Sequence, residues 1–239
     1  MSSALALGLG SQGHEFFLYN PTLSKAQSLK GQLKKAQLWQ GQDFEAVVLG
    51  FKPQKLTEAM SDLSAIVTPQ TLIISLLAGV KLEKLQTLFH SRVLRLMPNL
   101  AIAENKGVCL WSSLLEAQEN RFWQTTLNSL GFAPQVEERE LDLYTLHAGC
   151  SPAYLYFLIQ EMKDLAQQSG GDPALAAKIL TLSLQGALDK LKGDEDFQGL
   201  ITQVASKGGV TEATLKHWNE SGAIASGLKA GLERIQQLS

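Results

Sequence analysis

Near the end of the sequence, a short loop with two glycines has the residue types and spacing of an anion-binding site. Gly208 and Gly209 are adjacent, Thr211 follows two positions later, and an apolar helical pattern begins directly after them. Adjacent glycines let the backbone approach a ligand closely, and the first N–H groups of a helix point at whatever binds there. The residues at 206–211 therefore predict a site for a carboxylate or a phosphate, although a simple turn between two helices would use the same residue types.

The elements that must position this loop change in character along the chain. Up to about residue 140, short apolar runs alternate with helical patterns, which is typical of a parallel sheet covered by helices. Beyond it the patterns are almost wholly helical. We predict an α/β fold with a mostly parallel sheet at 1–140, followed by an all-helical domain at 141–239. The predicted strands are Glu15–Tyr19, Ala36–Leu38, Glu45–Gly50, Thr71–Leu77 and Val93–Met97. The predicted helices are Ser2–Ser11, Ser24–Leu33, Gln54–Leu63, Lys81–Phe89, Pro152–Gln168, Pro173–Leu191, Phe197–Ala205, Thr211–Asn219 and Ala223–Leu238.

Composition excludes several classes of partner. The 239 residues carry a formal net charge of −2 with scattered basic residues, so nothing indicates binding to nucleic acid or to an anionic membrane. No apolar run reaches the roughly 18 residues of a membrane span. The two cysteines, Cys109 and Cys150, lack metal-ligand spacing and suit reduced thiols of a cytoplasmic protein, and no metal site is predicted. A small molecule is the expected ligand.

Turn-forming and polar residues follow four of the predicted strands. In an open parallel sheet, ligands bind beyond the carboxyl ends of the strands. A single proline or asparagine there is weak evidence, but four such loops in one chain are specific when taken together. These loops are Asn20-Pro21-Thr22, Gly50-Phe51-Lys52-Pro53, Ala78-Gly79-Val80 and Pro98-Asn99.

In order and spacing, these motifs make the chain resemble the pyrroline-5-carboxylate reductase family over nearly its whole length. The motifs that carry the resemblance are Phe51-Lys52-Pro53, Ala78-Gly79-Val80, Met97-Pro98-Asn99, Gly149-Cys150-Ser151-Pro152-Ala153-Tyr154 and Lys207-Gly208-Gly209-Val210-Thr211. The resemblance implies a Rossmann-like dinucleotide-binding domain and a helical domain that dimerises by interlocking with its partner. It also implies a homodimer or a higher homo-oligomer.

The largest departure from the family lies at the front of the chain. A dinucleotide-binding domain opens with a strand and a Gly-x-Gly-x-x-Gly turn. Here Met1 to Leu5 match the helix that follows this turn in the family, so the first strand is missing. We expect the natural protein to start upstream of Met1; the alternative is a homologue that closes its sheet differently and has lost the cofactor.

The loop after the second strand of such a domain selects the cofactor. An acidic residue there would hold the ribose hydroxyl of NAD, and a basic residue would accept the extra phosphate of NADP. The stretch from Asn20 to Lys25 contains no acid, which favours NADP (NADPH) and leaves NAD as the alternative.

The resemblance also implies the chemistry and the roles of the site residues. Hydride would pass from the reduced nicotinamide to the imine carbon of a small cyclic imino acid, giving proline. The backbone N–H groups of Gly209, Val210 and Thr211 would hold the substrate carboxylate, Gly208 and Ser206 would complete the loop, and the Thr211 hydroxyl would serve catalysis at the ring nitrogen or carboxylate. The cofactor-binding residues would be Asn20, Phe51, Lys52, Pro53, Ala78, Gly79 and Asn99.

Two other functions stay open on the residues alone. A related NADP-dependent dehydrogenase of another small acid would need a catalytic lysine or acid in the helical domain, and no convincing candidate is present. A noncatalytic ligand-binding homologue is favoured by the missing nucleotide turn. The replacements Ala148 and Cys150, where the family has serines, leave substrate details open.

Overall fold

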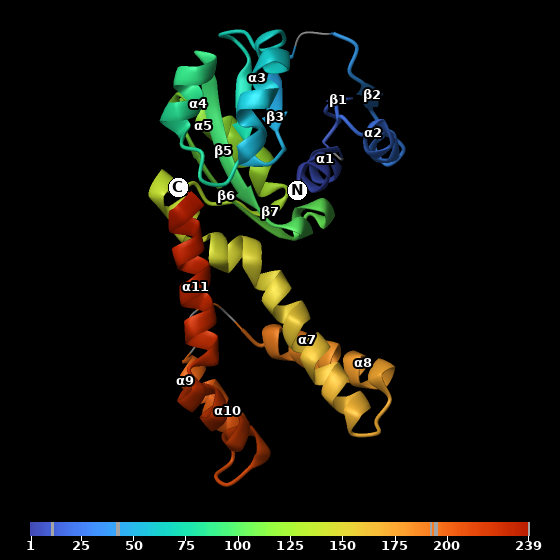
Figure 1. Ribbon diagram of the computed structural model, residues 1–239, viewed down its shortest axis with the longest axis vertical. Coiled ribbons are helices and arrows are strands. Elements are labelled where there is room, and N and C mark those ends of the chain that lie inside the picture. The colour runs from blue at the N-terminus through green and yellow to red at the C-terminus, as the bar shows by residue number, and fades with distance from the viewer. Residues whose placement is uncertain (11, 42–43, 192, 194–195, 239) are drawn as a thin grey trace. The chain divides into compact units, whose positions relative to one another are not determined.

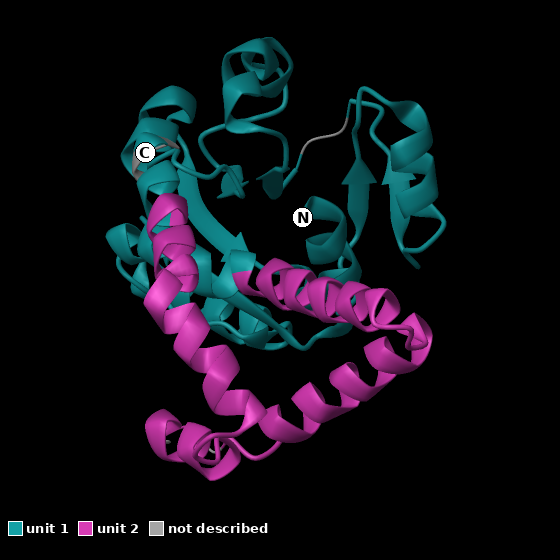
Figure 2. Cartoon of the chain, turned by 60° about the horizontal axis from the view of Figure 1, so that its bottom comes forward, with its two compact units in different colours: residues 1–150, 232–239 teal, residues 151–231 magenta. Residues whose placement is uncertain are grey.

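The computed structural model describes residues 1–10, 12–41, 44–191, 193 and 196–238, which form two compact units (Figures 1 and 2). Unit 1 comprises residues 1–150 and 232–239, and unit 2 comprises residues 151–231. The units therefore divide after Cys150 and not at the predicted boundary of 140/141. The reason is that Leu141 is fully buried in an apolar cluster of unit 1 with Leu110 and Ala148.

The described residues of unit 1 form seven strands in two sheets. One sheet pairs β1 and β2 in parallel, and the other has the order β3-β4-β5-β6-β7. The pairs β3–β4, β4–β5 and β6–β7 are parallel, and β5–β6 is antiparallel. The strands are β1 (Phe16–Leu18), β2 (Ala36–Leu38), β3 (Ala46–Leu49), β4 (Leu72–Ser75), β5 (Arg92–Pro98), β6 (Gly107–Ser113) and β7 (Gly131–Phe132).

Helices cover both faces of the larger sheet. On β4, Leu72 and Ile74 join one apolar cluster while Ile73 joins the other, because successive side chains of a strand point to opposite faces. The first cluster receives side chains from α1 and α5, and the second receives them from α3 and α4. The helical segments of unit 1 are α1 (Ser2–Gly10), α2 (Leu23–Lys30), η1 (Pro53–Lys55), α3 (Leu56–Ser64), α4 (Leu82–Phe89), η2 (Leu100–Glu104), α5 (Ala117–Asn128), α6 (Glu138–Leu143) and η3 (Leu146–Cys150).

The five predicted strands and the mostly parallel sheet are confirmed, but sequence reasoning missed everything between β5 and α7. The predicted helix end at Ser11 lies outside the described residues. The missed strand β6 returns antiparallel to β5 after a turn in which Asn105 adopts the left-handed conformation (φ 55°). Its apolar run Val108-Cys109-Leu110-Trp111 was the available signal for a buried strand.

Unit 2 is helical, as predicted, and has an unusual distribution of apolar side chains. It contains α7 (Ser151–Gln168), α8 (Pro173–Leu188), α9 (Phe197–Val204) and α10 (Val210–Ser221), while α11 (Ala223–Leu238) runs from unit 2 into the part of the chain assigned to unit 1. Among the described residues of α7 to α10, none is fully buried, and Tyr156, Phe157 and Leu182 are at least 63% exposed. Helices whose apolar side chains are this exposed are expected to bury them against another chain.

Candidate active site

Three of the predicted loops lie along one edge of the larger sheet. The strands β3, β4 and β5 are parallel neighbours, so Gly50-Phe51-Lys52-Pro53, Ala78-Gly79 and Asn99 all follow the carboxyl ends of adjacent strands. The residue types of the three motifs did not by themselves require the strands that precede them to be adjacent in the sheet. In open α/β sheets this edge is where ligands bind.

The loop after β3 lies against the start of α1. The Ser2 hydroxyl donates a hydrogen bond of 3.1 Å to the carbonyl oxygen of Gly50. A Cβ atom on Gly50 would lie 1.8 Å from that hydroxyl oxygen, so a side chain at this position would force Ser2 to move. The exposed Lys52 and the half-buried Phe51 and Pro53 follow, with Pro53 as the first residue of η1.

The loop after β4 is held at its beginning by a buried hydroxyl. The N–H of Leu77 donates to the Ser75 hydroxyl at 3.2 Å, and both residues are buried. Ala78 is half-buried, and Gly79 adopts a left-handed backbone conformation with φ of 73°. This conformation is strained for other residues, so the turn itself requires a glycine at position 79.

Asn99 is fixed by the turn that connects β5 with β6. Its N–H donates to the carbonyl oxygen of Val108 at 2.9 Å, and its side-chain Oδ1 accepts from the Val108 N–H at 3.2 Å. The residue is only 9% exposed. Its side-chain oxygen therefore stabilises the protein itself, and contact with a cofactor would fall to its amide nitrogen.

Asn20 lies at the carboxyl end of the separate two-stranded sheet. Its side-chain oxygen accepts a 2.8 Å hydrogen bond from the N–H of Thr22 and shapes the turn into α2. The loop thus follows β1 as predicted, with the side-chain oxygen engaged within the loop.

The glycine loop of unit 2 has its own internal hydrogen bonds. The Gly209 N–H donates to the carbonyl oxygen of Ser206 at 2.9 Å, and the Gly208 N–H donates to Oε2 of Glu212 at 2.6 Å. Gly208 is left-handed, with φ of 73°. The Gly209 N–H, which the sequence predicts to hold the substrate carboxylate, is thus engaged within a tight turn of the loop.

The other two N–H groups predicted to bind the substrate carboxylate, those of Val210 and Thr211, lie together at the start of α10. The helix begins at Val210, one residue earlier than predicted, so the N–H groups of Val210 and the half-buried Thr211 belong to its first turn. These N–H groups have no carbonyl partner one turn earlier within the helix. Sequence reasoning overlooked Glu212, although an acid in the first helical turn is a known capping signal.

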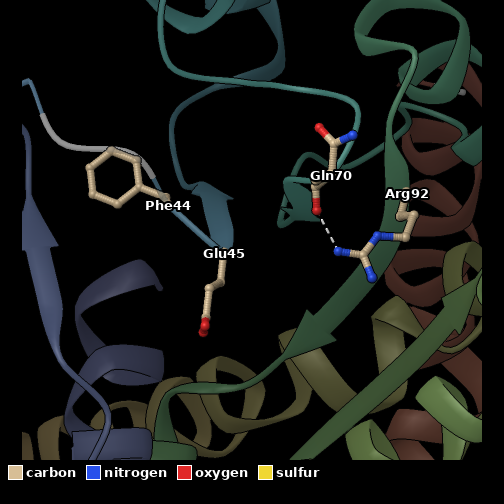
Figure 3. Close-up of a pocket in the computed structure, with 4 residues that line it drawn as sticks. All are labelled: Phe44, Glu45, Gln70 and Arg92. Atoms are coloured by element: carbon tan, nitrogen blue, oxygen red, sulfur yellow. Dashed lines mark hydrogen bonds between the residues drawn. The ribbon is translucent and has the colours of Figure 1, made fainter.

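The described part of unit 1 also contains a hollow of about 510 Å³ lined by Phe44, Glu45, Gln70 and Arg92 (Figure 3). The Arg92 guanidinium donates to the carbonyl oxygen of Gln70 and pairs with Glu119. These residues precede or begin β3, β4 and β5, so the hollow opens at the amino ends of the strands, opposite the edge that carries the predicted loops. It is not the candidate active site.

Two features are absent from the residues that the structure describes. There is no group of three His, Cys, Asp or Glu side chains placed to hold a metal ion. No helix in this part of the chain combines the length and the apolar character that crossing a bilayer demands.

The fold and the loops at its sheet edge define a Rossmann-like α/β protein with an added helical unit. Residues 138–238 match the family model described as pyrroline-5-carboxylate reductase dimerisation. The chain is 30% identical to the pyrroline-5-carboxylate reductase of Pasteurella multocida over 259 aligned positions, covering 100% of this chain and 94% of that protein. The chain belongs to the pyrroline-5-carboxylate reductase family.

Other comparisons agree with this membership. Pyrroline-5-carboxylate reductase 2 of Bacillus subtilis is 34% identical over 182 residues, covering 74% of this chain and 65% of that protein. The structure of 1-pyrroline-5-carboxylate reductase from Streptococcus pyogenes superimposes with a TM-score of 0.86 at 25% identity, covering 100% of this chain and 94% of that one. A Plasmodium falciparum pyrroline carboxylate reductase with NADP bound shares the fold, with a TM-score of 0.82 at 22% identity over 100% of this chain and 95% of that one.

Proposed function

We propose that this protein reduces the cyclic imine pyrroline-5-carboxylate to proline with hydride from NADPH. The observation that carries the proposal is the set of three family motifs, beginning at Phe51, Ala78 and Met97, at the carboxyl ends of three adjacent parallel strands. Relatives of matching length carry the name of this reductase.

The residues of unit 1 fit a dinucleotide. The start of α1 touches Gly50 through Ser2, so the positive end of this nine-residue helix lies beside the loop after β3. A pyrophosphate bound there would meet helix N–H groups and the loop backbone at Gly50, where a side chain would displace Ser2. The loop after β1 has no acid to select NAD, which supports NADP.

When bound, the reduced nicotinamide supplies the hydride. Lys52, Pro53 and the amide nitrogen of Asn99 would border its ring, and Gly79 would let the ring approach the backbone. Because the substrate can arrive with its ring nitrogen already protonated, orientation and electrostatics suffice and no strong general acid is needed. The three loops contain few titratable groups, which agrees with a reaction that needs no strong general acid.

Unit 2 would hold the substrate. Its carboxylate would accept hydrogen bonds from the N–H groups of Val210 and Thr211 at the start of α10, where the helix dipole also favours a negative charge. The Thr211 hydroxyl would hold the ring nitrogen. Gly208 and Ser206 would shape the loop through the bonds described above.

The working form would be a homodimer or a larger homo-oligomer. The exposed apolar side chains of α7 and α8 and the match to a dimerisation domain support this assembly. We infer that the glycine loop of one subunit meets the nucleotide-binding unit of its partner, so that two chains share each site. The free thiols Cys109 and Cys150 support a cytoplasmic location.

Oxidation of NADPH, followed at 340 nm with and without pyrroline-5-carboxylate, tests the proposal, with NADH in a parallel assay and proline measured as the product. The protein is purified from its native source. We expect turnover that requires the imine and prefers NADPH, and loss of about 1 to 3 kcal/mol of transition-state stabilisation in Thr211→Val. A folded protein that binds NADPH without forming proline would instead indicate another small acid as substrate; failure to bind any dinucleotide would indicate a noncatalytic homologue.

A further inference from the structure

A buried arginine on β5 lies between two carboxylates of α6. The Arg95 side chain is 1% exposed, and its guanidinium nitrogens lie 3.0 Å from Oε1 of Glu138 and 2.6 Å from Oδ1 of Asp142. A charge this deeply buried requires paired, hydrogen-bonding partners. Sequence reasoning placed Arg95 within a strand and assigned no role to any of the three residues.

Glu138 makes a second contact, with the start of α4. Its Oε1 atom also accepts a 2.6 Å hydrogen bond from the backbone N–H of Leu82, the first residue of α4. The N-cap residue of this helix, Lys81, makes no side-chain cap. Glu138 therefore supplies, from 56 residues further along the chain, the carboxylate that the start of α4 lacks locally.

The contact at Leu82 completes the anchoring of the loop after β4. At the other end of this loop, the Leu77 N–H is held by the Ser75 hydroxyl. Between the two anchors lie Ala78 and the left-handed Gly79, the residues proposed to lie against the nicotinamide. Because Leu77, Val80 and Leu82 are all buried, we expect a shift at the start of α4 to displace Ala78 and Gly79 as well.

We propose that Glu138 is a positioning residue for the cofactor: by bonding the Leu82 N–H while paired with Arg95, it sets the conformation of the Ala78–Gly79 loop. The inference rests on the proposed function. It predicts that loss of Glu138 weakens NADPH binding in addition to lowering the stability of the protein. A substitution of Asp142, which also pairs with Arg95, shows the effect of losing an Arg95 ion pair alone.

The first experiment compares Glu138→Ala, Glu138→Gln and Asp142→Ala by NADPH titration, steady-state kinetics and thermal unfolding. Glutamine keeps an acceptor for the Leu82 N–H but loses the charge. We expect Glu138→Ala to raise the Kd and KM for NADPH about tenfold, the equivalent of one lost charge-assisted hydrogen bond. The KM for the imine should stay within about twofold of wild type in the same variant. Glu138→Gln and Asp142→Ala should lower the melting temperature while their NADPH affinity stays close to wild type.

A second variant separates positioning from folding. Lys81→Ser in the Glu138→Ala background supplies a local N-cap for α4. It should restore NADPH affinity without restoring the stability lost with the Arg95 ion pair. Hydrogen exchange at the Leu82 amide should rise in Glu138→Ala and stay raised in the double variant, whereas the amides of Glu83 and Lys84, which a serine N-cap bonds, should become more protected there. This readout needs no turnover.

Two results would overturn the proposal. One is an unchanged Kd for NADPH in Glu138→Ala at a temperature where the variant is folded. The other is an equal loss of affinity in Asp142→Ala and Glu138→Ala, which would leave only a general structural role. A wild-type protein that binds NADPH but forms no proline would contradict the proposed reaction, and the titrations would still test Glu138.

Discussion

Ser2 and Gly50 are in direct contact: the Ser2 hydroxyl donates to the Gly50 carbonyl oxygen at 3.1 Å, and a methyl group on Gly50 would overlap that hydroxyl. The contact joins the first turn of α1 to the carboxyl end of β3, which are 48 residues apart in sequence. An anion bound at the start of α1 would therefore lie beside the loop that contains Lys52. This relationship makes the predicted nucleotide site open to a test at a single glycine.

Gly50→Ala should weaken cofactor binding. The new Cβ atom would lie 1.8 Å from the Ser2 Oγ and 2.7 Å from the Ser2 Cβ, so the helix start or the loop must move. We expect the Kd for NADPH, measured by fluorescence titration, to rise about tenfold or more. The Ser2 Cα lies 3.9 Å away, an ordinary contact, so Ser2→Gly combined with Gly50→Ala should recover most of the affinity. Equal weakening in the single and double variants would show that the overlap is not the cause.

The sequence allowed prediction of the parallel part of the fold, because each parallel strand is a short apolar run bounded by turn residues. The antiparallel return through β6 was missed although its apolar run is visible, because no α-helix separates it from β5 as one separates the parallel strands. Arg95 was beyond sequence reasoning for a different reason. An arginine inside a strand pattern has no visible partner, and its two carboxylates lie 43 and 47 residues away.

The candidate site was predictable as a set of loops but not as a set of free hydrogen-bonding groups. The residues after β3, β4 and β5 lie where the rule for open sheets requires. Which N–H groups of the glycine loop remain available depends on the turn, and that turn engages Gly209 with Ser206 and Gly208 with Glu212. Residue types alone do not determine such pairings.

Alanine at position 208 and alanine at position 209 should disturb the glycine loop for different reasons. Gly208 is left-handed with no atom within 4 Å of a new Cβ, so Gly208→Ala should cost about 1 kcal/mol of loop strain. Gly209 has an ordinary φ of −86°, but its Cβ would lie 2.6 Å from the Ser206 Oγ and 2.9 Å from the Ser206 carbonyl oxygen. We expect Gly209→Ala to raise the KM for the imine more than Gly208→Ala does, while the KM for NADPH stays unchanged in both. Ser206→Ala should rescue Gly209→Ala only in part, because the carbonyl contact remains; complete rescue would contradict this account.

Leu182→Glu should disrupt self-association. Leu175, Ile179 and Leu182 follow one another at the spacing of a single helical face on α8, and all three are more than half exposed. A carboxylate buried there without a partner should weaken the dimer about a hundredfold or more. Light scattering coupled to size exclusion would measure the change, with Lys190→Glu, a charge change beyond the end of α8, as the control. A Leu182→Glu protein of wild-type mass at micromolar concentration would remove α8 from the interface.

Cys109 should make the fold sensitive to alkali. It is 1% exposed, and burial raises the pKa of its thiol from 9.0 to about 12. Between these two values the unfolded chain releases the thiol proton and the folded chain keeps it. The stabilising contribution is therefore complete below pH 9 and is lost as the pH rises towards 12.

Urea unfolding at pH 8 and pH 10.5 would measure this contribution in wild type and in Cys109→Ala. Groups that titrate in both proteins cancel in the comparison, so wild type should lose about 2 kcal/mol more than the variant between the two pH values. The alanine variant should itself be less stable at pH 8, because it leaves a small cavity beside Trp111 and the other residues of the first apolar cluster. An identical pH dependence in the two proteins would mean that the folded state ionises Cys109 as readily as the unfolded state does, and hence that water reaches this part of the core.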